Sequence, residues 1–188
     1  MDGESMRFAY ADPPYLGCGR LYAKHHPEAL IWDEVSEHRA LVERLCDDYK
    51  DGWALSLHEP SLRDYLKFIP NDARIASWVK PFAAFKKGVT RAYTWEPVIF
   101  WHGRKIPTTS PTWRDHISEP ITMKKGLTGA KPHKFNLWVL AGLGFQRGDT
   151  LDDLFPGTNG MAAAVAEMCR SEPQFEMGMF TQPQQGER

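Results

Sequence analysis

The chain has little cysteine and no long hydrophobic run, and each shortage excludes a class of protein. Its three cysteines, Cys18, Cys46 and Cys169, are too few and too far apart for a disulfide framework. We therefore expect reduced thiols and a cytoplasmic location. No apolar stretch approaches the roughly 20 residues needed to span a bilayer. The opening "MDGESMRF" lacks the apolar core of a signal peptide, so we expect no membrane partner.

Internal repeats are absent as well, and the 188 residues fit a single domain with a real core. The formal net charge is only −1, but charge is unevenly distributed along the chain. Residues 78–134 carry eleven Lys or Arg against three acids, whereas the rest of the chain is negative. A positive segment of this kind fits a surface that meets phosphates, and a solvated loop region is the alternative.

Strand and helix patterns alternate, which predicts an α/β sheet layered between helices. Strands are predicted at 6–11, 52–57, 73–79, 96–102 and 148–155, with a last one at 174–180. Helices are predicted at 33–49, 61–69 (capped by Ser61), 131–144 (ending at Gly144) and 159–170. Residues 16–33 and 103–130 lack a clean period and are predicted to be loops.

A glycine-rich turn, "DLFPGTNG" at 153–160, connects the predicted strand at 148–155 directly to a helix. Glycine lets backbone approach a bound molecule closely, and a helix start offers unpaired amides. In an α/β sheet this is a natural cradle for a nucleotide or cofactor, with a purely structural turn as the alternative. Asp152 and Asp153 are strand neighbours that point to opposite faces, which excludes a shared catalytic role.

The first predicted strand runs straight into "DPPY" at 12–15, which taken alone could be a proline-rich turn. Three further segments accompany it: "SWVKPF" at 77–82, "YTWEPVIFWHGRK" at 93–105 and "AKPHKF" at 130–135. In this order, followed by "DLFPGTNG", they resemble the permuted (beta) class of S-adenosylmethionine-dependent DNA amino-methyltransferases. The resemblance covers most of residues 6–178. The small size is similar to that of solitary methyltransferases encoded by phages.

The resemblance implies a single-domain Rossmann-like sheet flanked by helices, with circularly permuted motif order and a sheet trimmed at one edge. It implies S-adenosylmethionine as cofactor and no metal. The implied catalytic residues are Asp12, Pro13, Pro14 and Tyr15. The implied cofactor-binding residues are Lys131, Pro132, Asp153, Phe155, Gly157, Asn159 and Glu176. For Glu176, simple surface exposure is an equally good interpretation.

The chemistry that the resemblance assigns to DPPY has a physical basis. An exocyclic amine is a poor nucleophile because its lone pair is delocalised into the ring. Asp12 and the carbonyl of Pro13 can accept its two N–H bonds and so aim the lone pair, while the prolines keep both acceptors rigid. Tyr15 would stack on the base, a contact worth about 1–3 kcal/mol, which helps offset the cost of flipping the base from a duplex.

The resemblance also divides the single domain, 1–188, into a catalytic half (6–101), a short recognition region (102–130), a cofactor-binding half (131–178) and a tail (179–188). Phosphate contacts are expected from Lys24, Arg104, Lys105, Arg114, Lys124 and Lys125. The sequence departs from the family pattern at Asn159, which replaces a glycine, although Asn tolerates a left-handed backbone. It departs again at Asp152, which stands at a normally apolar strand position.

The favoured reaction is methyl transfer to adenine N6 in DNA. Cytosine N4 and RNA stay open, because their amines present the same geometry to DPPY. A non-catalytic nucleic-acid-binding module is the rival that the Asn159 change favours, and a methyltransferase acting on protein or small molecules is a second rival. DNA is the expected partner, and a second copy of the chain is a further candidate.

Overall fold

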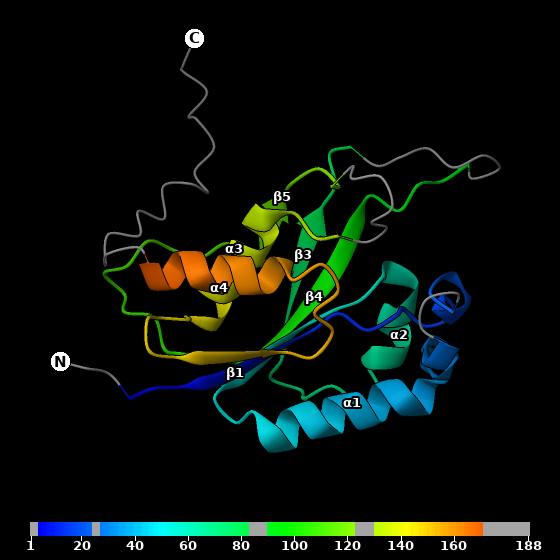
Figure 1. Ribbon diagram of the computed structural model, residues 1–188, viewed down its shortest axis with the longest axis horizontal. Coiled ribbons are helices and arrows are strands. Elements are labelled where there is room, and N and C mark those ends of the chain that lie inside the picture. Colours follow the sequence, from blue (N-terminus) through cyan, green and yellow to red (C-terminus); the bar gives the residue numbers. More distant parts are fainter. Residues whose placement is uncertain (1–3, 24–26, 83–89, 123–129, 171–188) are drawn as a thin grey trace, which may run out of the picture.

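The computed structural model describes residues 4–23, 27–82, 90–122 and 130–170. They form a six-stranded sheet with helices on both faces (Figure 1). The strands are β1 (Arg7–Ala11), β2 (Gly52–Ser56), β3 (Arg74–Val79), β4 (Trp95–His102), β5 (His116–Ser118) and β6 (Thr150–Asp153). Their order across the sheet is β5-β3-β4-β2-β1-β6. The predicted strands at 6–11, 52–57, 73–79, 96–102 and 148–155 are thus confirmed.

The α-helices are α1 (Val35–Asp48), α2 (Leu62–Tyr65), α3 (His133–Leu143) and α4 (Gly160–Arg170). Helices α3 and α4 cover one face of the sheet, and α1 and α2 cover the other (Figure 1). Alternate residues of one strand serve the two faces, as a pleat requires. Phe8 and Tyr10 of β1 pack toward α3 and α4, whereas Ala9 and Ala11 pack toward α1. In the described residues, no helix has the length and apolar character needed to cross a bilayer.

Three local predictions need correction. Residues 16–33 are not simply a loop, because they contain the 3₁₀ helices η1 (Gly19–Leu21) and η2 (Pro27–Asp33). The helix predicted at 61–69 has only four α-helical residues. Its expected cap fails because the Ser61 hydroxyl pairs with Nδ1 of His58 (2.7 Å) instead of a backbone amide. The region predicted as loop at 103–130 contains the three-residue strand β5.

The C-terminal end of α3 follows the prediction. Gly144 adopts a left-handed conformation (φ 68°), and its N–H donates to the carbonyl of Ala141 (3.1 Å). A side chain there would meet Arg104, because an added Cβ would lie 2.8 Å from the Cβ of that residue. Glycine is therefore required both by the backbone angle and by the close approach of the chain after β4. The strand predicted at 174–180 lies outside the described residues.

Strand direction distinguishes the two ends of the sheet, at which the strands begin or finish. Strands β1, β2, β3, β5 and β6 run in the same direction and β4 runs against them. We call the end at which the five parallel strands finish the carboxyl edge. It carries residues 12–15, 57–61, 80–82 and 154–160, together with the start of β4. The opposite end, the amino edge, carries residues 4–6, 103–107 and 144–149.

Candidate functional site

The two motifs that lie far apart in the sequence meet at the carboxyl edge. Strand β1 leads into Asp12, and strand β6 leads into the turn after Asp153. The strands pair in parallel, with Tyr10 opposite Asp153, and the N–H of Leu154 donates to the carbonyl of Tyr10 (2.9 Å). The carboxyl ends of adjacent parallel strands are where α/β sheets bind ligands. This adjacency places DPPY and the glycine turn close enough to act on one pair of bound molecules.

Lys131 contacts DPPY directly. Its ammonium donates to Oδ1 of Asp12 (2.9 Å) and to the hydroxyl of Tyr15 (2.8 Å). The residue comes just before α3, so this helix is tied to the end of β1. The sequence predicts that Lys131 binds the cofactor, and that stays a prediction; the contacts of Lys131 within the protein are with residues implied in catalysis.

Glu96, near the start of β4, completes a buried charged network. Its Oε2 accepts from the Tyr15 hydroxyl (2.8 Å) and from Lys131 (3.4 Å), and its Oε1 pairs with Lys80. The side chains of Glu96 and Lys80 are only 13% and 12% exposed, and that of Lys131 is 9% exposed. Together with Asp12 there are two carboxylates and two ammonium groups, so the formal charges cancel. Such compensation is what allows charges to be buried.

Burial and neighbouring charge pull the pKa values of this network in different directions. Burial raises the pKa of Asp12 above its ordinary value, and Lys131 opposes that rise only in part. Burial alone would raise the pKa of Glu96, but Lys131 and Lys80 outweigh it and lower that pKa. Burial alone would lower the pKa of Lys131, but Asp12 and Glu96 hold it above its ordinary value. Lys131 therefore stays charged, and Asp12 is the more basic of the two carboxylates.

The two oxygens of Asp12 have different surroundings. Lys131 and the longer contact with the Tyr15 hydroxyl (3.3 Å) both involve Oδ1. Oδ2 has no hydrogen-bond donor among the described residues, and the Asp12 side chain is 20% exposed. The carbonyl of Pro13 accepts no backbone hydrogen bond within the same set. Two acceptors next to each other in the chain therefore have no hydrogen-bond donor within the described part of the chain.

The Tyr15 ring is fixed from two sides. His58, which follows β2, stacks on it with ring centroids 5.2 Å apart and planes 15° apart. His58 is itself held by its hydrogen bond to Ser61 (2.7 Å). Because the Tyr15 hydroxyl is bound to Glu96 and Lys131, the ring keeps one orientation. Pro14, between Pro13 and Tyr15, is half-buried at this edge.

The turn after β6 keeps an open backbone. Gly157 (φ 45°) and Asn159 (φ 57°) are both left-handed, so the expectation that Asn tolerates this conformation is confirmed. Both residues are exposed, and a Cβ added at Gly157 would meet only the carbonyl of Phe155 at 3.7 Å. The angle rather than crowding thus favours glycine at 157. The backbone of the turn is thus exposed just before the start of α4.

The aspartates of β6 have separate surroundings, as predicted. Asp152 accepts from Arg7 (2.6 Å) and from the Tyr49 hydroxyl (2.8 Å). Asp153 accepts from the N–H of Phe155 (3.3 Å), and burial raises its pKa. Asp153 is thus the aspartate that remains at the carboxyl edge beside Asp12.

Phe155 connects the glycine turn at 153–160 to the segment that follows DPPY. Its ring meets Trp32 of η2 edge to face, with centroids 5.1 Å apart and planes 77° apart.

Pro132, which precedes α3, accepts from the N–H of Asn136 (3.2 Å). Asn136 is also the residue that a Cβ on Gly160 would meet, at 2.9 Å from its Nδ2. Helix α3 and the residues just before it therefore lie next to both motifs, with Lys131 at one and Asn136 at the other.

Two of the predicted phosphate contacts lie at the amino edge. Arg104 donates to Oδ1 of Asp149 (2.6 Å), and Lys105 is exposed next to it. Arg114 is exposed just before β5, and its carbonyl accepts from Trp138 (2.8 Å). The structure thus does not bring Arg104 and Lys105 to Asp12. Lys24, Lys124, Lys125 and Glu176 lie outside the described residues.

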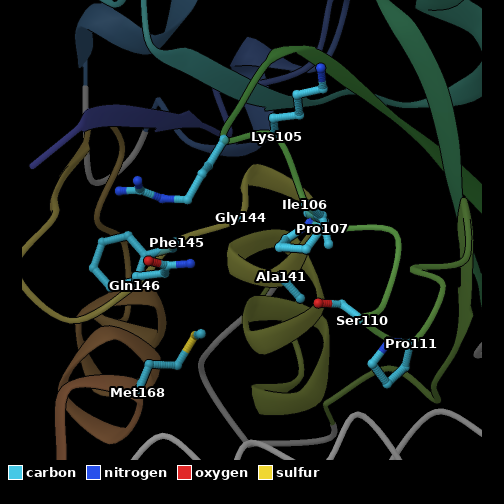
Figure 2. A pocket seen from close by; sticks show the side chains of 11 residues that line it. Lys105, Ile106, Pro107, Ser110, Pro111, Ala141, Gly144, Phe145, Gln146 and Met168 are labelled. Atoms are coloured by element: carbon cyan, nitrogen blue, oxygen red, sulfur yellow. The ribbon is translucent and has the colours of Figure 1, made fainter. Parts of the chain in front are cut away.

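A cavity of about 190 Å³ lies beside Arg104 and Lys105, where the chain after β4 passes α3 and α4 (Figure 2). Ile106 and Pro107 face Ala141 of α3 across it, and Met168 of α4 closes another side. The lining is mostly apolar. This cavity belongs to the amino edge and not to the site around Asp12.

Several residues of the site were not identified from the sequence, namely Lys80, Glu96, His58 and Trp32. Lys80 and Glu96 lay inside segments quoted for the family resemblance, but neither was assigned a role. The signal available in the sequence was a charged residue next to or within a strand expected to be buried: a Lys directly after β3 and a Glu in β4.

Not all of the positive charge in residues 78–134 is available to phosphates. Lys80 and Lys131 form ion pairs with the carboxylates of the buried network, and Lys134 pairs with Glu119 (3.3 Å).

No protein-family model matches this sequence, and a search of curated proteins finds no significant match. Solved structures do resemble it. The complex of M1.HpyAVI with SAM has a TM-score of 0.53 at 15% identity, covering 87% of this chain and 79% of the other. TTHA0409 from Thermus thermophilus, described provisionally as a DNA modification methylase, has a TM-score of 0.59 at 14% identity, covering 87% and 77%. At these identities the likeness establishes the fold alone, the α/β sheet flanked by helices that both structures share with this chain.

Proposed function

We propose that this protein transfers a methyl group from S-adenosylmethionine to an exocyclic amine of a DNA base, with adenine N6 as the favoured acceptor. The observation that carries the proposal is the meeting of DPPY and the glycine turn at the ends of adjacent parallel strands, β1 and β6. Two solved structures share the fold: TTHA0409 is described provisionally as a DNA modification methylase, and M1.HpyAVI was solved in complex with SAM. The permuted motif order is part of the same proposal.

The residues around β6 suit the cofactor. Asp153 offers a carboxylate, and Gly157 and Asn159 present left-handed, exposed backbone beside the start of α4. Polar groups of a nucleoside and an amino acid can be bound by a carboxylate and by free helix-start amides. S-adenosylmethionine supplies a methyl group that is already activated by a sulfonium. Phe155 and Pro132 would border this site, and Glu176 is a further proposed contact.

The DPPY residues suit the acceptor amine. Oδ2 of Asp12 and the carbonyl of Pro13 can each accept one N–H, which turns the nitrogen lone pair away from the ring and toward the methyl group. The neighbouring prolines hold both acceptors in place. Tyr15, fixed by His58 and Glu96, would hold the base by stacking. The raised pKa of Asp12 makes its carboxylate a stronger hydrogen-bond acceptor.

Two measurements test this proposal. Calorimetric titration with S-adenosylmethionine should give binding, and its absence at millimolar cofactor would favour a non-catalytic binding module. Incubation of DNA with the protein and methyl-labelled cofactor, followed by mass spectrometry of the nucleosides, should give N6-methyladenine. Detection of N4-methylcytosine would show that cytosine is the acceptor base. Labelling of RNA alone would show that the substrate is RNA and not DNA. With protein or small molecules as the only labelled acceptors, the proposal would be wrong.

A further inference from the structure

Glu96 lies behind the catalytic motif and contacts it through two other side chains. It is opposite Trp78 in the β3–β4 ladder, so its position is set by the sheet. Its Oε2 binds Tyr15 and Lys131, and its Oε1 binds Lys80. Lys80 is in turn held over the Trp78 ring, 4.9 Å from its centroid. Glu96 is therefore a rigidly anchored carboxylate whose second oxygen faces DPPY.

The hydrogen-bond capacity of Lys131 gives this arrangement a consequence. An ammonium group has three N–H donors. Lys131 has three acceptors: Oδ1 of Asp12 (2.9 Å), the Tyr15 hydroxyl (2.8 Å) and Oε2 of Glu96 (3.4 Å). With all three donors directed in this way, the ammonium is held on Oδ1 and away from Oδ2. Without the Glu96 carboxylate, one donor would be released and the ammonium would be drawn further onto Asp12.

We propose that Glu96 is a positioning residue, which holds Lys131 and Tyr15 on one oxygen of Asp12 and so keeps the other oxygen open for the acceptor amine. The inference rests on the proposed function for the identity of the amine. Its electrostatic part does not, because the effect of Glu96 on Asp12 exists whether or not a methyl group is transferred. Glu96 acts through Lys131 and Tyr15, so it is not itself a catalytic residue.

The test variant is Glu96→Gln, which keeps the size of the side chain. It offers a single carbonyl oxygen to Tyr15, Lys131 and Lys80, which in the wild type bind two carboxylate oxygens. Glu119→Gln is the matched control, because it neutralises a glutamate paired with a lysine, Lys134 (3.3 Å), outside the network. Glu96→Asp, which retains the charge, serves as the rescue variant. If Glu96→Gln does not fold, Lys80→Met removes the anchor of Glu96 and replaces it in the same measurements.

The first readout is the titration of the Asp12 carboxyl carbon by NMR, which needs no activity. Glu96 raises the pKa of Asp12, so Glu96→Gln should move the titration to lower pH, whereas Glu96→Asp and Glu119→Gln should leave it close to wild type. For Lys80→Met a shift to higher pH is expected instead, because this variant removes a cation from the network and leaves Glu96 with Lys131 as its remaining cationic partner. The charged and titratable groups that face Asp12 are Lys131, Glu96, Tyr15, Tyr10, Tyr22, Tyr65 and Asp153. An unchanged Asp12 titration in Glu96→Gln would overturn the inference.

The second readout is single-turnover methyl transfer at saturating cofactor. Displacement of a reacting group by about 1 Å can cost about 100-fold, and we expect a loss of that order in Glu96→Gln with the Kd for S-adenosylmethionine within twofold of wild type. A wild-type rate in that variant, or an equal loss in Glu119→Gln, would also overturn the inference. An inactive wild-type protein would instead contradict the proposed function, and the NMR titration would still decide whether Glu96 controls Asp12.

Discussion

Two aspartates, Asp149 at the amino edge and Asp12 at the carboxyl edge, each pair with a basic side chain. They differ in how many of their oxygens are bound and in how far the side chain is exposed. Asp149 at the amino edge accepts from the N–H of Met6 (2.9 Å) and from Arg104 (2.6 Å) on Oδ1, and from the N–H of Gln146 (2.8 Å) on Oδ2. Its side chain is 2% exposed. Asp12 at the carboxyl edge is 20% exposed, and its pairing with Lys131 involves Oδ1 alone.

This difference separates a structural carboxylate from one available to a ligand. Asp149 has both oxygens bound and ties the chain before β1 to the chain before β6. Asp12 is held in orientation by one oxygen while the other is open, in a network that lacks a net charge. An acceptor that is already oriented needs no rearrangement when a substrate binds. The predictions below test whether the two aspartates differ in this way.

The largest effect is expected for Asp12→Ala. Lys131 retains Glu96 as a partner, so no buried charge is orphaned and the fold should survive. Loss of the oriented acceptor should slow single-turnover methyl transfer about 10³-fold, with cofactor affinity nearly unchanged by calorimetry. A rate within tenfold of wild type would contradict the role of Asp12.

Asp149→Ala should have the reverse signature. It removes the acceptor of two backbone N–H groups and leaves Arg104 without its carboxylate. Breaking such a pair costs about 3 kcal/mol or more, which urea unfolding measures as a lower free energy of unfolding. Under conditions where the variant is folded, its transfer rate should match wild type. A stable but inactive Asp149→Ala would contradict the separation of the two edges.

The pH dependence of transfer should follow Asp12. Protonation of Asp12 turns one of its oxygens into an O–H donor and weakens the carboxyl as an acceptor of N–H bonds, so the rate should rise with pH through its pKa. Because burial raises that pKa, the acid limb should lie above the ordinary aspartate value of about 3.9. Below the limb the rate should fall about tenfold per pH unit. Circular dichroism at each pH checks that the fold persists, and an acid limb at or below the ordinary value would contradict the prediction.

Tyr15→Phe should have a smaller effect. It keeps the ring and its stacking on His58 but removes the hydroxyl that binds Glu96 and Lys131. One hydrogen bond to a charged group is worth about 1.5–3 kcal/mol, so a loss of about 10- to 150-fold in transfer rate is expected. Tyr15→Ala, which also removes the ring, should be worse. Equal rates for the two variants would argue against a stacking role.

The smallest effect is expected for Lys105→Ala. Lys105 lies at the amino edge, whereas Arg91, which is also exposed, lies before β4 at the carboxyl edge. If DNA is bound over Asp12, Arg91→Ala should weaken DNA binding and reduce the slope of log affinity against log salt by about 1. Lys105→Ala should change affinity less than twofold. Fluorescence anisotropy at several salt concentrations measures both, and the opposite ranking would place DNA at the amino edge.

The local elements were largely predictable from the sequence, and so were the two motifs. Hydrophobic period identified the strands and the longer helices, and Gly144 marked the end of α3. Two predictions failed for local reasons. The Ser61 hydroxyl forms a hydrogen bond with His58 and not with a backbone amide, and the three-residue strand β5 is too short to show a hydrophobic period. The pairing of Lys131 with Asp12 was not predictable, because hydrophobic period says nothing about partners 119 residues apart.

What the sequence by itself determined is the chemistry available: an acid and two prolines after one buried strand, and a glycine turn after another. Asn159 could be judged from sequence too, since its tolerance of left-handed backbone is intrinsic to the residue. Only the tertiary structure decided which oxygen of Asp12 is open. That depends on Glu96, Lys80 and Lys131, which three separate segments bring to one edge of the sheet. Burial makes each charge require a partner, and only the folded sheet determines which partner is near.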